Sequence, residues 1–254
     1  MRLRISSVAT ARAAVIVAAF AALELMCRAG IIDRVTMIPP SEMLLALGRI
    51  LASGRFNADI AFTIWNTAAA IAIAVAGGFF IGALLHAVPR VRRTVEPLLS
   101  AYYAVPIFVF YPLLVVAFGV GRAALIAMGA LFGVVAMVVN TMLGLDRVPR
   151  AILKTARVMR LGPWPSLVLV RLPAASPHLV TGVKLAVAYS VIAIVAGEFI
   201  LASAGMGKRI AFGYNDFDNA TMYGMLLLLL ILVMLVNGAL SAWERRLHRR
   251  FGQR

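Results

Sequence analysis

The sequence predicts an all-α polytopic membrane protein with about six transmembrane helices. Of its 254 residues, 63% are hydrophobic and the mean hydropathy is +0.95, which is too apolar for a soluble domain of this length. The apolar residues gather in runs of about 20, and a helix of that length crosses a hydrocarbon core of roughly 30 Å. The whole chain, 1–254, is expected to form one transmembrane domain, with spans at residues 10–28, 62–88, 97–118, 123–144, 179–201 and 222–243.

The first expected span follows a basic N-terminal stretch and contains one carboxylate, Glu24. Glu24 can pair with Arg28, which lies one helical turn further on. Two interpretations of this span are open. It is a cleaved signal peptide if the small-x-small sequence Ala19-Phe20-Ala21 serves as a cleavage site, and a retained membrane helix if it does not. We favour the retained helix because the apolar run continues beyond that sequence.

Residues 29–60 are mixed in polarity and are expected to form an external loop with one surface helix. Pro39-Pro40-Ser41-Glu42 is a turn and N-cap signal ahead of the amphipathic stretch Met43–Leu51. The second span is rich in alanine and glycine, and small residues allow close helix packing in lipid. The glycines concerned are Gly77, Gly78 and Gly82.

The third expected span contains two internal prolines, Pro106 and Pro112, and follows a tight basic loop at residues 90–93. Two prolines predict a kinked or broken helix. The carbonyl groups that they free are tolerated only where they are buried in protein or face a watery cavity. Both residues are therefore candidates for the wall of a solute pathway, and the alternative is a kink used for packing.

A basic, proline-punctuated segment, Pro149–Lys184, follows the fourth span. At 100° per residue, residues 149–160 form a short amphipathic helix with a basic face. That face consists of Arg150, Lys154 and Arg157, and the opposite face consists of Ile152, Ala156 and Met159. Prolines 163, 165, 173 and 177 are expected to stop any continuous helix. The segment thus predicts a helical hairpin at the membrane surface, which presses either on anionic headgroups or on a partner protein.

The basic residues are distributed unevenly between the two sides of the membrane. With a cytoplasmic N-terminus, 18 of the 25 Lys and Arg residues fall on the cytoplasmic side and 7 on the other. This asymmetry follows the positive-inside rule and places both termini and the loop 146–177 in the cytoplasm. Topology therefore accounts for most of the +15 formal net charge, and nucleic acid binding is not needed to explain it.

A few polar residues stand inside or beside the apolar runs. Glu198 is expected at the outer interface, as part of a gate or dimer contact or simply as a carboxylate near water. Lys184 lies near the cytoplasmic end of its helix and can extend its ammonium group to the interface. Asn66 and Asn140 either bond across helices or line a pathway.

No constellation for catalysis or metal binding is evident in the sequence. Gly205-Met206-Gly207-Lys208-Arg209 does not match a phosphate-binding loop, because Ala202 stands in place of a glycine and Arg209 in place of Ser or Thr. The three histidines are scattered, no Ser/His/Asp signature is present, and the single Cys27 has no partner for an intramolecular disulfide. We expect neither an enzyme nor a metal site.

The loop also carries part of a recognisable motif. Leu172-Pro173, with Val170 two residues earlier, resembles the Ile-x-Leu-Pro end of the coupling loop in the membrane subunits of bacterial ABC importers. Counting back places Lys154-Thr155-Ala156 on the Glu-Ala-Ala of that motif and Arg160 on its glycine. Lys154 and Arg160 depart from the family pattern. Other residues that resemble it are Ala156, Arg157, Met159, Pro177 and Gly182, together with Pro39-Pro40-Ser41, Ala117-Phe118-Gly119-Val120-Gly121, Gly197-Glu198-Phe199 and Gly205-Met206-Gly207.

The resemblance is strongest to the nitrate, taurine and aliphatic-sulfonate type of this family. It implies the membrane subunit of an ATP-driven importer in a bacterial inner membrane, working as a homodimer with a cytoplasmic ATPase and an external substrate-binding protein. ATP would be bound by the partner, and this chain would need no cofactor. The implied ATPase-coupling residues are Lys154, Thr155, Ala156, Arg157, Met159, Arg160, Val170, Leu172 and Pro173, and the pathway or gate candidates are Pro106, Pro112, Asn140 and Glu198.

Two other function classes compete with this interpretation. A secondary transporter or channel that works without an ATPase usually needs intramembrane carboxylates for proton coupling. Only Glu24 and Glu198 qualify, and both stand near helix ends. A membrane enzyme is disfavoured by the missing catalytic constellation.

For Ala156 in the coupling loop, the proposed advantage of a small side chain is that it lets the short helix sit deep in a partner's cleft.

Overall fold

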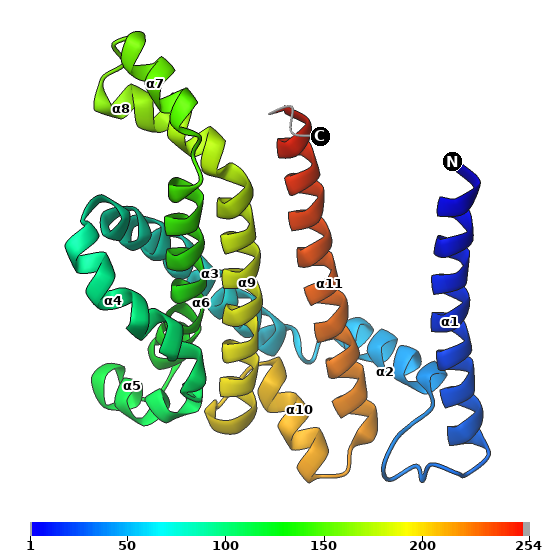
Figure 1. The fold of residues 1–254 in the computed structure, drawn as a ribbon. Coiled ribbons are helices and arrows are strands. Elements are labelled where there is room, and N and C mark those ends of the chain that lie inside the picture. The colour runs from blue at the N-terminus through cyan, green and yellow to red at the C-terminus, as the bar shows by residue number, and fades with distance from the viewer. Residues whose placement is uncertain (1, 251–254) are drawn as a thin grey trace.

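The computed structural model describes residues 2–250 and contains no strand in that range (Figure 1). The all-α prediction is confirmed. The α-helices are α1 (Arg2–Arg28), α2 (Pro40–Ser53), α3 (Asn57–Ala87), α4 (Pro89–Ala101), α5 (Tyr111–Phe118), α6 (Arg122–Asp146), α7 (Arg150–Val158), α8 (Pro163–Ser166), α9 (Leu172–Leu201), α10 (Met206–Asn215) and α11 (Asn219–Arg250). Two 3₁₀ turns, η1 (Tyr102–Ala104) and η2 (Ile107–Phe110), and a π-helical turn, η3 (Leu167–Arg171), complete the described chain.

Five helical stretches among the described residues are long and apolar enough to cross a membrane. They are Thr10–Arg28, Asn57–Ala87, Arg122–Asp146, Pro163–Leu201 and Asn219–Arg246. A sixth candidate is the pair Pro89–Ala104 and Phe108–Phe118, which is bent by 100°. The prediction of about six spans is therefore confirmed in number, with the third one broken. Pro106 stands directly before η2 and Pro112 in the first turn of α5, where a missing N–H costs least.

The helix boundaries differ from the expectation in three places. The basic loop expected at residues 90–93 is helical, because Pro89 occupies the first turn of α4 and starts the helix early. The stretch between the expected spans 179–201 and 222–243 contains a further helix, α10. Pro173 and Pro177 were expected to interrupt the chain, but both lie within α9. Pro177 leaves the Pro173 carbonyl without its helical donor, and the Ser176 hydroxyl donates to that carbonyl at 2.8 Å.

The core is a layer of three long helices in which α6 lies between α3 and α9 (Figure 1). Small residues make this close packing possible. A Cβ atom added to Gly78 would lie 2.6 Å from the Met137 Cβ atom, and one added to Gly82 would lie 2.7 Å from the Thr141 Cβ atom. The packing role predicted for these two glycines is confirmed, whereas a Cβ on Gly77 would meet only Val134, at 3.9 Å.

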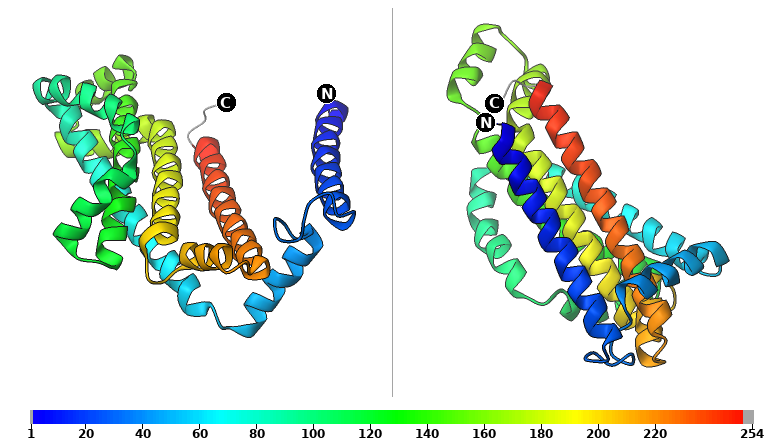
Figure 2. Two further views of the ribbon diagram at one scale, coloured as in Figure 1. Left: turned by 90° about the horizontal axis from the view of Figure 1, so that it is seen from below. Right: turned by 90° about the vertical axis from the view of Figure 1, so that its right-hand side faces the viewer.

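The first and last helices stand away from this core (Figure 2). Only 6% of the most apolar 18-residue stretch of each is buried, and α1 reaches the rest of the chain mainly through α2. The start of α1, the end of α11 and the α7–α8 hairpin all lie at one end of the molecule, and α2 and α10 lie at the other (Figure 1). The described chain thus presents a hairpin at one end and two short helices at the opposite end.

Candidate functional site: an exposed helical hairpin and a buried polar network at α10

The hairpin formed by α7, α8 and η3 projects beyond the long helices (Figure 1). Pro149 precedes α7, and Arg160 ends that helix in the left-handed region, with φ of 51°. The turn between α7 and α8 is rich in exposed apolar surface: Val158 is 82% exposed, Met159 66% and Trp164 72%. We call these three residues the hairpin tip. Exposed apolar residues gathered in one place are typical of a protein interaction site.

The predicted coupling residues fall into two groups. The first group is exposed on α7 and at the turn, next to the hairpin tip, and consists of Lys154, Thr155, Arg157, Met159 and Arg160. The second group is half-buried at the base of the hairpin and consists of Val170, Leu172 and Pro173. Val170 and Pro173 line a groove of about 550 Å³ that separates the base of α7 from η3 and α9. The two groups therefore lie on different surfaces of the hairpin.

Ala156 does not face outward as the sequence argument required. It is only 4% exposed, because α7 turns it towards the rest of the hairpin, where the Leu161 N–H donates to its carbonyl. In the described chain the Ala156 side chain packs inside the hairpin, and its expected entry into a partner's cleft stays a prediction. Val158 and Trp164, which the sequence argument missed, form the exposed surface instead. The signal that could have found them is the apolar character of the residues around the turn.

At the opposite end of the molecule, Glu198 is fully buried and does not lie near water as expected. Its Oε2 atom accepts hydrogen bonds from the Thr63 hydroxyl at 2.7 Å and from the Gly207 N–H at 3.1 Å, and its Oε1 atom has no hydrogen-bond partner. The expectation failed because α10 folds over the end of α9. Gly205, with φ of 112°, is where the chain turns, and a Cβ atom there would lie 2.7 Å from Oε1.

Asp59 extends this network to the start of α10. Its carboxylate accepts the Gly205 N–H at 3.0 Å and pairs with the Arg209 guanidinium at 2.8 Å. The Met206 N–H donates to the Thr63 hydroxyl at 2.8 Å. The first N–H groups of α10, which have no partner within their own helix, are thus satisfied by side chains of α3 and α9. We call Asp59, Thr63, Glu198 and Arg209, with the residues that they bond, the α10 network.

The remaining polar candidates are placed as follows. Asn140 is 9% exposed, and its side-chain amide donates to the Ala136 carbonyl of its own helix at 2.8 Å, so it does not face an open pathway within this chain. Asn66 is fully buried, and both of its amide atoms lack a hydrogen-bond partner. Lys184 forms an ion pair with Glu244 of α11. The sequence had indicated only that its ammonium group extends to the interface. Pro106 and Pro112 are exposed at the broken helix.

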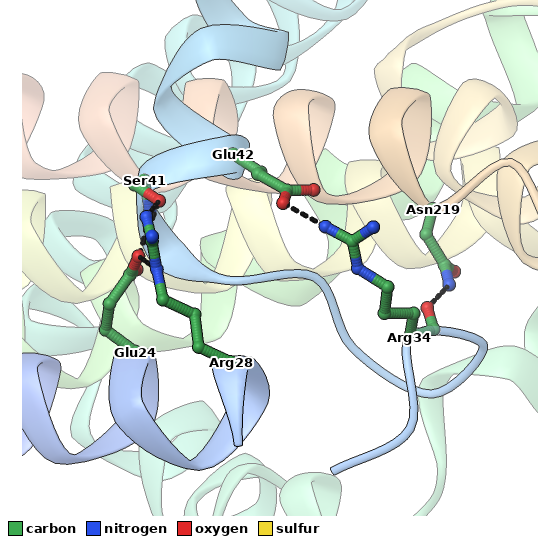
Figure 3. A network of polar contacts seen from close by, with 6 residues as sticks. All are labelled: Glu24, Arg28, Arg34, Ser41, Glu42 and Asn219. Carbon is green, nitrogen blue, oxygen red and sulfur yellow. Dashed lines mark hydrogen bonds and ion pairs between the residues drawn. The ribbon is translucent and has the colours of Figure 1, made fainter. Parts of the chain in front are cut away.

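The end of α1 is tied to α2 by polar contacts (Figure 3). The predicted Glu24–Arg28 ion pair is confirmed, with an N–O distance of 2.6 Å. Glu24 also accepts hydrogen bonds from the backbone N–H and the hydroxyl of Ser41, at 3.0 and 2.7 Å. An ion pair between Arg34 and Glu42, and the Asn219 amide bonded to the Arg34 carbonyl, extend these contacts to the start of α11. Ser41 thus bonds α1. It does not cap α2, which begins at Pro40 with Pro39 in the N-cap position.

An aromatic cluster lies beside the broken helix and was not anticipated. The ring of Tyr103 lies 5.1 Å from that of Tyr189 and 5.8 Å from that of Phe132, measured between centroids. The Tyr102 hydroxyl donates to the Leu131 carbonyl at 2.9 Å, which fixes the turn after α4 on α6. Among the described side chains, no three metal-ligating residues lie together.

The fold and the hairpin define a polytopic membrane protein that presents a helical hairpin beyond its spans. The model of one family, described as the inner membrane component of binding-protein-dependent transport systems, matches residues 74–253. The chain belongs to this family, whose members are membrane components of transport systems and are not enzymes.

Curated relatives carry several substrate names. The riboflavin transport system permease protein RibX of Chloroflexus aurantiacus is 28% identical over 160 residues, which cover 60% of each chain. The nitrate import permease protein NrtB of Leptolyngbya laminosa is 28% identical over 72% of this chain and 64% of its own length. The putative aliphatic sulfonates transport permease protein SsuC of Bacillus subtilis is 24% identical over 86% of this chain and 79% of its own length. The chain thus spans about three fifths of the length of the first two relatives.

A solved structure shows the same fold. A chain of the MetNI methionine ABC transporter in an inward-facing conformation superposes with a TM-score of 0.67 at 22% identity. The match covers 76% of this chain and 95% of that one.

Proposed function

We propose that this chain is the membrane-spanning subunit of an ATP-driven importer, which forms the solute pathway and couples it to a separate cytoplasmic ATPase. The observation that carries the proposal is the exposed hairpin tip in a chain of this transport family. Val158, Met159 and Trp164 are 82%, 66% and 72% exposed around the turn between α7 and α8, and Arg157 and Arg160 stand beside them in the chain. Aromatic residues, Met and Arg are the side chains enriched in protein interfaces.

Lipid is the alternative contact for the hairpin. A basic face alone suits anionic headgroups, and each charge near such a surface contributes about 1 kcal/mol. The hairpin, however, extends beyond the ends of the other long helices (Figure 1), and Val158, at the turn between α7 and α8, is 82% exposed. This placement favours a protein in the cytoplasm, and ATP would be bound by that partner and not by this chain.

The proposed location is a bacterial inner membrane, with both termini in the cytoplasm. The excess of Lys and Arg on one side of the expected spans supports this orientation. The start of α1 and the end of α11 also lie at the same end of the molecule as the hairpin (Figure 1). In this orientation α2 and α10 face outward, where an external substrate-binding protein would dock.

We propose that two copies of the chain surround the pathway. The sparse burial of α1 and α11 supports further packing against protein as well as lipid. The broken helix with Pro106 and Pro112 is the proposed pathway wall, because irregular backbone at membrane depth needs a watery or protein environment. Asn140 contributes only from its buried position between α6 and α9. Glu198 would hold the external ends of α3, α9 and α10 together, so that a gate formed there moves as one unit.

The proposed solute is small and anionic, of the nitrate, sulfonate or taurine type. The described carboxylates of α3, α6 and α9 are either buried or ion-paired, so none stands free to hold a cation or repel an anion. Two of the relatives named above carry nitrate and sulfonate in their names. The earlier alternative, a transporter or channel that works without an ATPase, is disfavoured because the chain belongs to a family of binding-protein-dependent systems.

The coupling proposal is tested with Met159→Asp and Val158→Asp at the hairpin tip. Val35→Asp is the matched control, because Val35 is 60% exposed and lies at the other end of the molecule. The tagged chain is purified in mild detergent together with the ATPase encoded beside it, and ATP-driven uptake is measured in vesicles. Loss of the ATPase from both tip variants, but not from the control, is expected. Retention of the ATPase in all three would contradict the proposal.

The solute class is tested on the binding protein encoded with the chain. Calorimetric titration with nitrate, taurine, an alkanesulfonate, riboflavin and glycine betaine is expected to give binding for one of the first three. Binding of riboflavin or glycine betaine alone would overturn the anionic assignment without affecting the coupling proposal.

A further inference from the structure

Three helices meet in a charged cluster at the hairpin end of the molecule. Asp146, the last residue of α6, receives both arms of the Arg92 guanidinium from α4, with Nη1–Oδ1 and Nη2–Oδ2 distances of 2.8 Å. The His86 Nδ1 atom of α3 lies 3.1 Å from the same carboxylate. A two-armed contact of this kind fixes the orientation of both partners as well as their separation.

Asp146 stands where the hairpin leaves the helical core. Only residues 147–149 separate it from α7, and the middle one, Val148, is 6% exposed. Val148 packs with Leu145, Ala175 and Leu153, so the first arm of the hairpin is anchored at the end of α6. Asp146 therefore lies directly beside the short linker that joins α7 to α6.

Arg92 belongs to α4, which is loosely attached to the core. No residue of α4 is buried, and Val95 and Leu99 pack on Leu85, Val138 and Met142. A cavity of about 230 Å³ lies along the seam between α4 and α6 and is lined by Arg92, Glu96 and Tyr103, among others. Because α4 is the first arm of the bent helix pair that contains Pro106 and Pro112, its position bears directly on that of the proposed pathway wall.

We propose that the Arg92–Asp146 pair is the link through which movement of the hairpin reaches α4 and the pathway wall. The inference rests on the proposed coupling function and assigns two positioning residues that the family motif does not contain. The side chains are 22% and 35% exposed, so the pair is partly open to solvent at the foot of the hairpin. Its geometry, between the foot of the hairpin and a loosely packed helix, is what suits it to transmit displacement.

The experiment measures ATP hydrolysis and solute uptake in the same vesicles, with the chain, its ATPase and its binding protein reconstituted together. The variants are Asp146→Asn, Arg92→Gln and the two combined. The matched control is the Lys184–Glu244 ion pair, whose side chains are 29% and 27% exposed and which joins α9 to α11 instead. Lys184→Gln and Glu244→Gln break that pair without touching α4.

In each single variant of the proposed link, uptake per ATP hydrolysed is expected to fall at least about fivefold, the low end of the range for coupled sites. The double variant should lose about as much as the worse single one, because the Arg92–Asp146 contact is the one that both substitutions remove, whereas Arg92–Glu96 and Asp146–His86 are each lost in one of them. Arg92→Lys keeps the charge but not the two-armed geometry. Its uptake per ATP hydrolysed should therefore lie between the wild-type value and that of Arg92→Gln. The control variants should keep the wild-type ratio.

Three results would overturn the link: unchanged uptake per ATP in the single variants, losses that multiply in the double variant, or equal losses in the control pair. If the wild-type complex shows no ATP-dependent uptake, the proposed function fails instead. The link is then judged by hydrogen exchange of residues 89–101 in the chain alone. That exchange should be faster in Asp146→Asn than in Glu244→Gln, and equal exchange would overturn the link.

Discussion

The geometry of the α10 network leads to a local prediction. In Thr63→Val the side chain keeps its shape but loses the hydroxyl that donates to Glu198 at 2.7 Å and accepts the Met206 N–H at 2.8 Å. A hydrogen bond contributes about 1 kcal/mol net, and a buried N–H left without a partner costs about 1–3 kcal/mol. The start of α10 should therefore be destabilised by about 2–4 kcal/mol.

Hydrogen exchange measured by mass spectrometry reports this change directly. A loss of about 2 kcal/mol speeds exchange from a locally opened state roughly 30-fold, so peptides covering residues 203–215 should exchange at least that much faster. The matched control is Thr141→Val. Thr141 is fully buried like Thr63, but its hydroxyl donates only to the Met137 carbonyl of its own helix, at 2.7 Å. Such a bond adds little to helix stability.

The reasoning is refuted if α10 exchanges equally fast in both valine variants. That outcome would mean that the apolar contacts of α10 with α9 and α11 hold it in place, and that the buried polar groups contribute nothing to its position. Faster exchange across all helices in Thr63→Val would instead show that the network stabilises the whole fold.

Two further predictions concern packing. Gly82→Ala places a Cβ atom 2.7 Å from that of Thr141 and should lower stability by about 1–3 kcal/mol, measured as thermal unfolding in detergent, whereas Gly77→Ala should leave it unchanged or slightly higher. Ala156→Asp puts an unpaired carboxylate inside the hairpin and should reduce the folded protein in the membrane, unlike Val158→Asp, which should affect only ATPase binding. Normal abundance of Ala156→Asp with loss of the ATPase would show that Ala156 does face the partner.

The long helices could be predicted because lipid imposes simple rules. Length, apolarity and the distribution of Lys and Arg depend on the bilayer and not on which helix contacts which, so they can be read along the chain. The glycines at 78 and 82 were likewise predictable, since they stand one turn apart on one face and α6 fits against them. The Glu24–Arg28 pair is also local, within a single helix.

The errors arose where a residue's environment depends on segments distant in sequence. Glu198 was placed near water from its depth along α9, but α10 folds back over it and supplies the N–H groups that make its burial tolerable. Ala156 was oriented by helical periodicity alone, which cannot say on which side of α7 the returning chain packs. Pro177 was taken as a helix breaker, but the neighbouring Ser176 hydroxyl bonds the carbonyl that the proline leaves free.

The two ends of the central helices are held by different chemistry, and this difference bears on how the subunit moves. At the α10 end, Thr63 and Glu198 are almost fully buried, so separating α3, α9 and α10 would strand polar groups away from water at a cost of several kcal/mol. At the hairpin end, the side chains of Arg92 and Asp146 are 22% and 35% exposed, so water can solvate them when they separate. A movement that starts at the hairpin is therefore expected to displace α4 while α3, α9 and α10 stay together as a pivot at the α10 network.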